Sequence, residues 1–135
     1  MNELEALLRG YLAAGDAGDL DALDRYVHRD VIVHEPGGRT ATGLEHERET
    51  WRSALAAMPG LRHEVQDVVC GESTLAARVV ILGTLRGEFA GVQADERSFA
   101  TDQAIFMRIR DGKAAEIWTV VDTGSFLRQV ASSPD

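Results

Sequence analysis

The sequence has almost none of the features that stabilise small secreted proteins or anchor a chain in a membrane. Its 135 residues include one cysteine, Cys70, so neither an internal disulfide nor a zinc site made of cysteines is possible. It contains no run of about eighteen apolar residues, and no basic N-terminal region precedes an apolar stretch. We therefore expect a cytoplasmic protein made of one domain at residues 1–130, with a short tail at 131–135.

Positive charge is also scarce. Fourteen Lys and Arg residues stand against 22 Asp and Glu residues, which gives a formal net charge of −8. Nucleic acids and anionic membranes both need a basic surface, so the sequence predicts neither as a partner. The acidic residues are scattered along the chain, which is typical of solvated faces.

The side-chain patterns that hold cofactors are missing too. The four histidines, His28, His34, His46 and His63, fall on different expected elements. The sole close pair of potential metal ligands is His34 with Glu35, too few for a metal site. No glycine-rich phosphate loop follows a strand, and no serine or cysteine has the context of a nucleophile elbow. We expect no metal and no cofactor.

The first part of the chain has helical periodicity. Apolar residues three and four positions apart predict a helix at 3–14, which Gly15 and Gly18 are expected to end. These apolar residues are Leu4, Leu7, Leu8, Tyr11 and Leu12. Asp19 is a suitable N-cap for a second helix that reaches about Val27.

A strand is expected at 30–34, ended by Pro36, and a third helix is expected at 44–58. The apolar side of that helix carries Leu44, Trp51, Leu55 and Met58. From residue 61 the pattern changes to that of strands. These are expected at 63–69, 75–89, 98–110 and 114–121, with a polar connection at 91–96 and a helical turn at 125–130.

Asp111-Gly112 is a strong signal for a hairpin between the last two strands. Helices followed by a run of strands indicate an α+β fold, with three helices on one face of a curved, mixed or antiparallel sheet. Such layers leave room for a mostly apolar pocket with a few polar groups.

Glu35 is the best candidate for a catalytic group. It follows a β-branched strand, and a carboxylate placed in an apolar pocket becomes a suitable general base. The alternative is a solvated turn residue beside Pro36. His34 alternates with Glu35 along the strand, so only one of them faces inward in regular geometry, and the pattern does not choose between them. Tyr11 either packs in the core or offers its hydroxyl to a substrate.

Alternation along the last two long strands predicts the pocket lining. Gln103, Ile105 and Met107 share the more apolar face of one strand, and Thr119 lies on the corresponding face of the next. Gln103 and Thr119 are thus the polar groups available to orient a substrate, together with Trp51 of the third helix. Trp118 and Asp122 should face outward. An exposed aromatic on a curved sheet favours a homodimer through that face.

The order of the elements and four segments resemble the SnoaL-like polyketide cyclase family of the NTF2-like superfamily. The segments are GDLDALDRYVHRDVIVHEPG at 18–37, LRHEVQDVV at 61–69, AARVVILGTLRGEFAGV at 76–92 and AIFMRIRDGKAAEIWTVVDTGSFLRQV at 104–130. The resemblance implies a cone-shaped pocket between a curved sheet and three helices. It also implies cofactor-independent acid–base catalysis on a polycyclic, hydrophobic carbonyl compound. In the cyclases that close the fourth ring of anthracycline precursors, the base is an aspartate that corresponds to Thr119. A nearby histidine corresponds to Ile105, whereas the cyclase glutamine matches Gln103.

The chain is also similar to ketosteroid isomerase, another NTF2-like enzyme. Tyr11 matches the tyrosine that polarises the substrate carbonyl, and Glu35 before Pro36 matches the general base. Ile105 stands where the second oxyanion donor would be. This resemblance implies that Glu35 takes a proton, that Tyr11 donates to the enolate oxygen, and that other pocket residues position the substrate.

Several functions therefore remain open at the level of sequence. The first is cyclase-type aldol or enolisation chemistry. The alternatives within enzymology are isomerisation of a ketosteroid-like enone and the hydroxylase role of some SnoaL-like proteins. A different class, a non-catalytic carrier of small molecules, fits a thin polar lining equally well.

Overall fold

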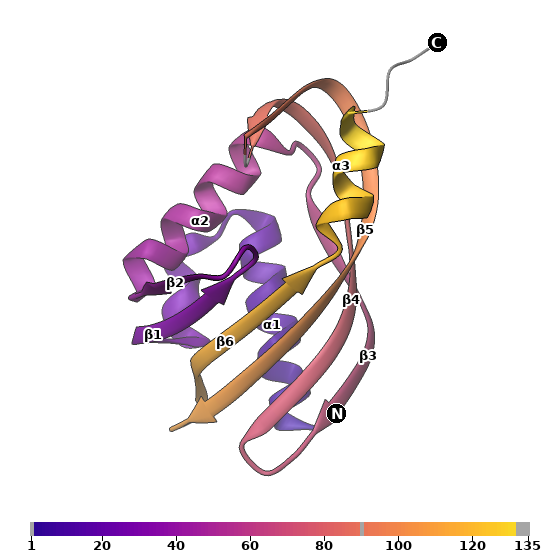
Figure 1. Ribbon diagram of the computed structural model, residues 1–135. Coiled ribbons are helices and arrows are strands. Elements are labelled where there is room, and N and C mark those ends of the chain that lie inside the picture. The colour runs from indigo at the N-terminus through magenta and orange to yellow at the C-terminus, as the bar shows by residue number, and fades with distance from the viewer. Residues whose placement is uncertain (1, 90, 132–135) are drawn as a thin grey trace.

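The protein folds as a curved, open, six-stranded sheet with helices packed against it (Figure 1). The computed structural model describes residues 2–89 and 91–131. Its helices are α1 (Glu3–Ala17), the 3₁₀ helix η1 (Leu20–Arg25), α2 (Leu44–Ala57) and α3 (Thr123–Ala131). Its strands are β1 (Val27–Glu35), β2 (Arg39–Thr42), β3 (Arg62–Cys70), β4 (Thr74–Phe89), β5 (Val92–Arg110) and β6 (Lys113–Val121). This arrangement confirms the α+β fold expected from the sequence.

The sheet is mixed because one pair of strands is parallel. The order is β2-β1-β6-β5-β4-β3, in which β1 runs parallel to β6 and every other neighbouring pair is antiparallel. The parallel pair joins the first part of the chain to its last strand. The end of β1, just before Pro36, lies close to α2 (Figure 1).

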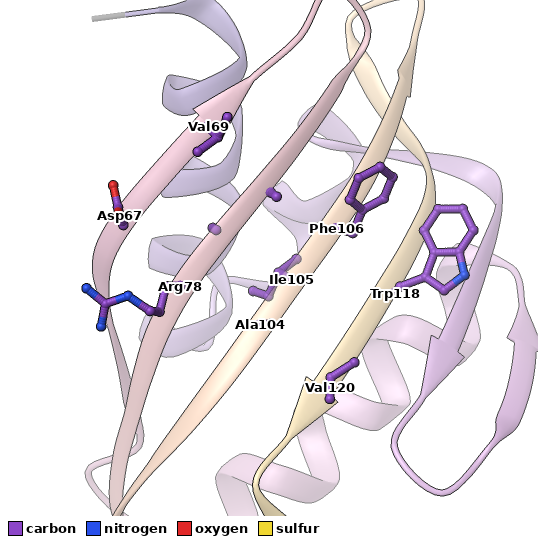
Figure 2. Close-up of a pocket in the computed structure, with 10 residues that line it drawn as sticks. Asp67, Val69, Arg78, Ala104, Ile105, Phe106, Trp118 and Val120 are labelled. Carbon is purple, nitrogen blue, oxygen red and sulfur yellow. The ribbon is translucent and has the colours of Figure 1, made fainter.

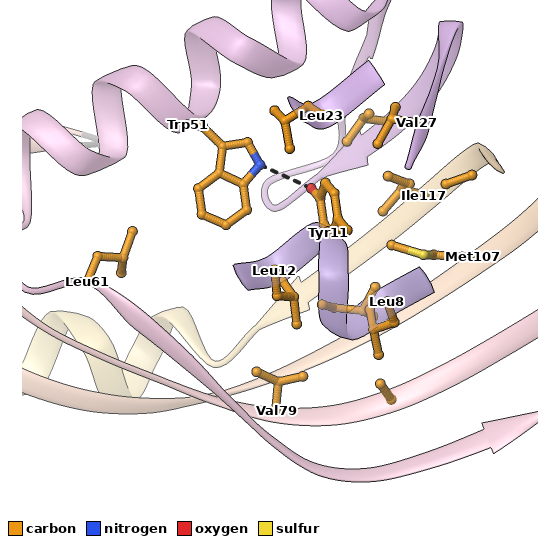
Figure 3. Packing of buried hydrophobic residues seen from close by; sticks show 14 of the residues in the cluster. Leu8, Tyr11, Leu12, Leu23, Val27, Trp51, Leu61, Val79, Met107 and Ile117 are labelled. Carbon is orange, nitrogen blue, oxygen red and sulfur yellow. Dashed lines mark hydrogen bonds between the residues drawn. The ribbon is translucent and has the colours of Figure 1, made fainter. Parts of the chain in front are cut away.

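The two faces of the sheet differ in character. The inner face, covered by α1 and α2, carries Gln103, Ile105 and Met107 of β5, all of them buried. Figure 3 shows how side chains from both helices and from β4, β5 and β6 meet there. The outer face carries the alternate residues, among them Phe106 and Trp118, which are cross-strand partners. Alternation along the strands thus follows the pattern predicted from the sequence.

The first helix is longer than expected. α1 continues through Gly15 to Ala17, and it ends at Gly18, whose φ of 74° is left-handed. The prediction that Gly15 helps to end the helix was therefore wrong. Gly15 is buried instead, and a Cβ there would lie 2.4 Å from Cζ2 of Trp51. The glycine is needed because the indole of α2 packs directly on the α1 backbone.

Other expected boundaries also moved. The segment after Asp19 forms the 3₁₀ helix η1 instead of an α-helix, and the Asp19 side chain makes no capping hydrogen bond. Val27 already belongs to β1, where it pairs with Ala114 of β6. The expected polar connection at 91–96 is strand, because β5 starts at Val92 opposite Phe89.

Two features near the ends of elements complete the fold. The sequence pattern did not predict β2. Gly37 and Gly38, which come directly before it, form the turn that folds β2 back on β1. The expected turn at 111–112 is confirmed, with positive φ angles of 52° and 75°. The helical turn expected at 125–130 belongs to α3, and residues 132–135 of the expected tail lie outside the described residues.

Candidate functional site

Glu35 lies at the end of β1 and points to the inner face of the sheet. The buried residues Val31 and Val33 have the same parity along β1, which places all three side chains on the covered side. The Glu35 side chain is only 12% exposed. Its Oε1 lies 3.2 Å from His46 Nε2 and accepts from the Thr50 hydroxyl at 3.5 Å, both on α2.

Arg39 of β2 completes the surroundings of Glu35, because its Nη2 donates to Oε2 at 3.4 Å. Four residues from three elements therefore meet where the sheet edge passes under α2. Contacts with an arginine, a histidine and a hydroxyl keep this carboxylate in a fixed orientation.

His34 faces the opposite side of the sheet. Its ring stacks on Trp118 of β6, with centroids 4.8 Å apart and planes at 12°. Its Nε2 lies 2.7 Å from Glu116 Oε2, and Thr40 lies 3.3 Å from Nδ1. Of the two alternating residues, the structure thus turns Glu35 inward and His34 to the outer face. His34 is separated from Tyr11 by the sheet.

Tyr11 takes part in a buried polar cluster with Glu47 and Trp51 of α2. The three side chains belong to residues that are 6%, 3% and 7% exposed. The Tyr11 hydroxyl and Glu47 Oε2 are joined by a hydrogen bond. Trp51 Nε1 donates at 3.3 Å to both of those oxygens, and Figure 3 marks its bond to Tyr11. The sequence brings them together because Glu47 and Trp51 are four residues apart on one face of α2.

Burial controls the ionisation of this cluster. The loss of water raises the pKa of Glu47 above its ordinary value of 4.5, and the negative charge of Glu35 raises it further. The hydrogen bonds from Tyr11 and Trp51 and the charge of His46 oppose the rise. Burial, followed by the charge of Glu47, raises the pKa of Tyr11 well above 10.0. The cluster therefore favours a protonated acid and a neutral phenol.

The raised pKa of Glu47 predicts how stability depends on pH. Above pH 4.5 the unfolded chain releases this proton while the folded protein still holds it. The free energy of unfolding should therefore fall as pH rises, until Glu47 ionises in the folded protein as well. Glu47→Gln has no such titration, so the stability of the wild type relative to Glu47→Gln should be highest at pH 4.5 and below. Urea denaturation over a pH series measures this difference. Glu49→Gln on the exposed side of α2 is the control, and parallel pH curves for wild type and Glu47→Gln would contradict the assignment.

A part-buried pair of side chains packs against Trp51. Asp16 of α1 binds His63 of β3 twice, through Oδ1 to the ring Nδ1 and through Oδ2 to the backbone N–H, both at 2.7 Å. The His63 ring lies 5.3 Å from the Trp51 ring, centroid to centroid. Trp51 is thus held between Tyr11 and His63, which fixes the orientation of its indole N–H.

The expected lining residues lie on the inner face, but they differ in what they can do. Ile105 and Met107 are 2% and 0% exposed and belong to the core. Thr119 is half-buried opposite Ile105. Gln103 is buried, and its Oε1 makes no hydrogen bond in the described part of the chain. A buried carbonyl oxygen without a donor marks a place where a donor from a ligand or water would be favourable.

Two hollows on the described surface are lined by neither Glu35 nor Tyr11. One of about 480 Å³ lies beside η1 and the start of α2. The other, of about 420 Å³, lies on the outer face of the sheet (Figure 2). Phe106, Trp118 and Val120 border this outer groove together with Val69 and Arg78. Phe106 and Val120 are 40% and 66% exposed, so the groove presents large apolar side chains to solvent.

The described residues contain no group of three or more His, Cys, Asp or Glu side chains able to hold a metal ion. Within residues 2–89 and 91–131, no helix has the length and apolarity needed to cross a membrane.

Glu47 is the site residue that the sequence reasoning missed. The signal was present, because Glu47 is three residues after Leu44 and four before Trp51, on the apolar face of α2. A glutamate on such a face is either badly placed or buried with a partner. His46 gave no comparable signal, since nothing in the local pattern relates it to the end of β1.

Comparison with known proteins agrees with this architecture. The profile of the SnoaL-like polyketide cyclase family matches residues 5–130. Among solved structures, IdmH, a candidate polyketide cyclase from Streptomyces antibioticus, is 29% identical with a TM-score of 0.84. The match covers 95% of this chain and 98% of IdmH. No match was found among curated proteins.

Two further structures extend the comparison. A SnoaL-like polyketide cyclase from Agrobacterium tumefaciens is 26% identical with a TM-score of 0.82, over 96% of this chain and 98% of that one. AclR, a candidate hydroxylase from Streptomyces galilaeus, is 25% identical with a TM-score of 0.80, over 97% of this chain and 82% of that one. The fold is therefore that of the NTF2-like superfamily, and the match over residues 5–130 shows that the chain belongs to the SnoaL-like polyketide cyclase family.

Proposed function

We propose that this protein is a cofactor-independent enzyme that uses general acid–base catalysis on a hydrophobic, polycyclic carbonyl compound. Glu35 removes a proton from the carbon next to the carbonyl, and the Tyr11 hydroxyl donates a hydrogen bond to the enolate oxygen that forms. The enolate then attacks a second carbonyl of the same substrate, as in an aldol cyclisation, or is reprotonated, as in an isomerisation.

The observation that carries this proposal is the shared dependence of Glu35 and Tyr11 on α2. His46 and Thr50 hold Glu35, and one residue further along the same helix Glu47 and Trp51 hold Tyr11. A base and a hydrogen-bond donor fixed by one rigid element satisfy the main geometric requirement of proton abstraction beside a carbonyl. Further support comes from family membership and from the unpaired buried oxygen of Gln103.

The first test is turnover of two substrate types by the wild-type protein. An anthracyclinone-type methyl ester probes cyclase chemistry, and a 3-oxo-Δ5 steroid probes isomerase chemistry. The metal-free protein should convert one of them without any added cofactor. Oxygen consumption during turnover would instead favour the hydroxylase role. This alternative is considered because the chain is similar to AclR, a candidate hydroxylase.

A carrier is the second candidate, and the packing of the inner face favours it. Ile105 and Met107 are so fully buried that the inner face leaves few groups to act on a substrate. Tight binding of either compound, measured by calorimetry, with no turnover under any condition would support the carrier and contradict the enzyme.

We also propose that two copies of the chain associate through the outer groove. A twofold interface uses the same self-complementary patch on each copy. The apolar border of the groove, formed by Phe106, Trp118 and Val120, can serve as that patch. The flanking charges are of both signs, with Arg78 and Asp67 beside the groove, so two copies can meet without a build-up of like charge.

Val120→Lys should therefore shift the protein from dimer to monomer, because it places a charge in the apolar border of the groove. Sedimentation velocity at matched concentrations measures the change. Leu127→Lys on α3 is the matched control, since Leu127 is also an exposed apolar residue, at 42%, but lies away from the groove. A monomeric wild type, or a dimer that survives Val120→Lys, would contradict this interface.

A further inference from the structure

The mechanism proposed above leaves one buried titratable group without a role. Glu47 is 3% exposed, and its carboxyl group is bonded to Tyr11, the residue that should donate to the substrate. We propose that Glu47 is a positioning residue that carries a proton in the working state and thereby frees the Tyr11 hydroxyl to donate to a substrate carbonyl. This inference rests on the proposed function.

The argument starts from the number of protons in the cluster. A tyrosine hydroxyl has one proton to donate, and an ionised carboxylate can only accept. When Glu47 is ionised, the Tyr11 proton points to Glu47 Oε2 and no proton remains for a substrate. In that state the phenol cannot polarise a carbonyl, although the hydrogen bond itself looks favourable.

Protonation of Glu47 reverses the bond. The carboxylic O–H then donates to Tyr11 Oη, and Trp51 Nε1, 3.3 Å away, donates to the same oxygen. A phenol oxygen that accepts two hydrogen bonds becomes a stronger donor through its own O–H, because the bonds along such a chain polarise one another. No proton is transferred to the substrate in this step. One proton is taken from solvent by Glu47, and the Tyr11 proton is redirected.

The groups around Glu47 are consistent with a protonated carboxyl. Tyr11 of α1 and Trp51 of α2 are neutral, Glu35 at the end of β1 is acidic, and His46 of α2 is the one group nearby whose charge favours ionisation. Glu47 also lies in the first turn of α2, where the helix dipole favours a negative charge. Burial outweighs these contributions and raises the pKa of Glu47.

The fixed geometry explains why Glu47 acts through Tyr11 instead of on the substrate itself. His63, held at both its ring and its backbone by Asp16, packs against Trp51. The indole N–H therefore stays directed at the two oxygens of the pair, 3.3 Å from each. Glu47 and Trp51 hold the Tyr11 hydroxyl in one place, and only its proton is free to change direction.

The first readout needs no substrate. In protein labelled with ¹³C at the glutamate carboxyl carbons, the signal of Glu47 is assigned by its loss in Glu47→Gln. It should report a protonated acid at pH values above 4.5, the ordinary value for a glutamate. Tyr11→Phe should raise the pKa of Glu47 further, because it removes a hydrogen bond that favours the ionised form. If Glu47 titrates at the ordinary value of 4.5, the inference is wrong.

The second readout is the pH profile of kcat. Activity of the wild type should fall by about tenfold per pH unit above the titration of Glu47, as for a single ionisation. Glu47→Gln should lose this alkaline fall, because its amide N–H donates to Tyr11 Oη without titrating. Below the titration of Glu47, Tyr11→Phe should lower kcat by roughly a hundredfold, and above it the two pH profiles should converge, because Tyr11 no longer donates in the wild type either. A purely structural Glu47 would leave the same alkaline fall in Glu47→Gln.

The third readout separates this inference from the proposed function. The carbonyl stretch of a bound polycyclic ketone, followed by infrared spectroscopy, should move to lower frequency when Tyr11 donates to it. The shift should vanish in Tyr11→Phe and above the titration of Glu47. A shift of this kind without turnover would overturn the enzyme and support the inference. The absence of any shift would overturn the inference even for an active enzyme.

Discussion

Glu35→Gln should lower kcat by roughly a hundredfold or more, because it removes the proposed base while preserving the size and hydrogen-bonding shape of the side chain. The amide can still accept from Thr50 and lie beside His46, so the end of β1 should keep its position. The loss should therefore appear mainly in kcat, with a small change in KM. Steady-state kinetics on the converted substrate, with folding checked by circular dichroism, measures it.

The matched controls for this prediction lie on the same molecule. Glu49→Gln makes the same chemical change on the exposed side of α2, where the side chain pairs with Arg52, and should leave kcat within a few tenths of a log unit. His34→Gln tests the alternating residue on the outer face, which contacts Trp118 and Glu116. A drop in kcat for His34→Gln as large as that for Glu35→Gln would move the base to the other face of the sheet and contradict the mechanism.

The partners of Glu35 should matter less for kcat than Glu35 itself. If the negative charge of Glu35 is the reactive form, its partners matter by orienting that charge, not by supplying a proton to the substrate. Removal of His46 should then lower kcat less than removal of Glu35 does. The Arg39 contact, at 3.4 Å and with the Arg39 side chain 79% exposed, should contribute least of all.

Much of this architecture could be predicted because periodicity in the sequence is local. Alternation along β5 and β6 assigned Gln103 and Met107 to the inner face, where both are buried. Two adjacent residues, Asp111 and Gly112, are enough to predict the turn with positive φ angles between β5 and β6. Where the signal lies within a few residues, no knowledge of the rest of the chain is needed.

The errors arose where the cause lies far away in the sequence. Gly15 was read as the end of a helix, and what requires it is an indole 36 residues later. Likewise, the choice between His34 and Glu35 depends on which face of β1 the helix α2 covers, and α2 is a separate element that the strand pattern does not describe. The Tyr11–Glu47 pair joins two helices separated by η1, β1 and β2, so no local pattern could specify it.

Gly15→Ala should destabilise the protein by about 2 kcal/mol, although alanine is the better helix former. Helix propensity alone predicts a gain of about 1 kcal/mol for this substitution in the interior of α1. Against that gain stands the new Cβ, which would lie 2.4–2.5 Å from three atoms of the Trp51 indole. Forcing extra volume into a packed core costs about 1–3 kcal/mol or more, and here both the backbone and the ring are held in place. Urea denaturation should therefore show a sign opposite to the one expected from propensity.

Trp51→Phe provides the decisive comparison, because the atoms that Gly15 approaches, Cζ2, Cε2 and Cη2, belong to the part of the indole that phenylalanine lacks. By itself Trp51→Phe should be destabilising, since it leaves a cavity and removes the hydrogen bonds of Nε1 to Tyr11 and Glu47. In that background, however, Gly15→Ala should cost much less or become stabilising, which a double-mutant cycle detects as a large coupling energy. An equal cost in both backgrounds would mean that something other than the indole excludes a side chain at position 15. A strong coupling would show instead that a single glycine in α1 sets how closely α2 approaches, and therefore where Glu47 and Trp51 meet Tyr11.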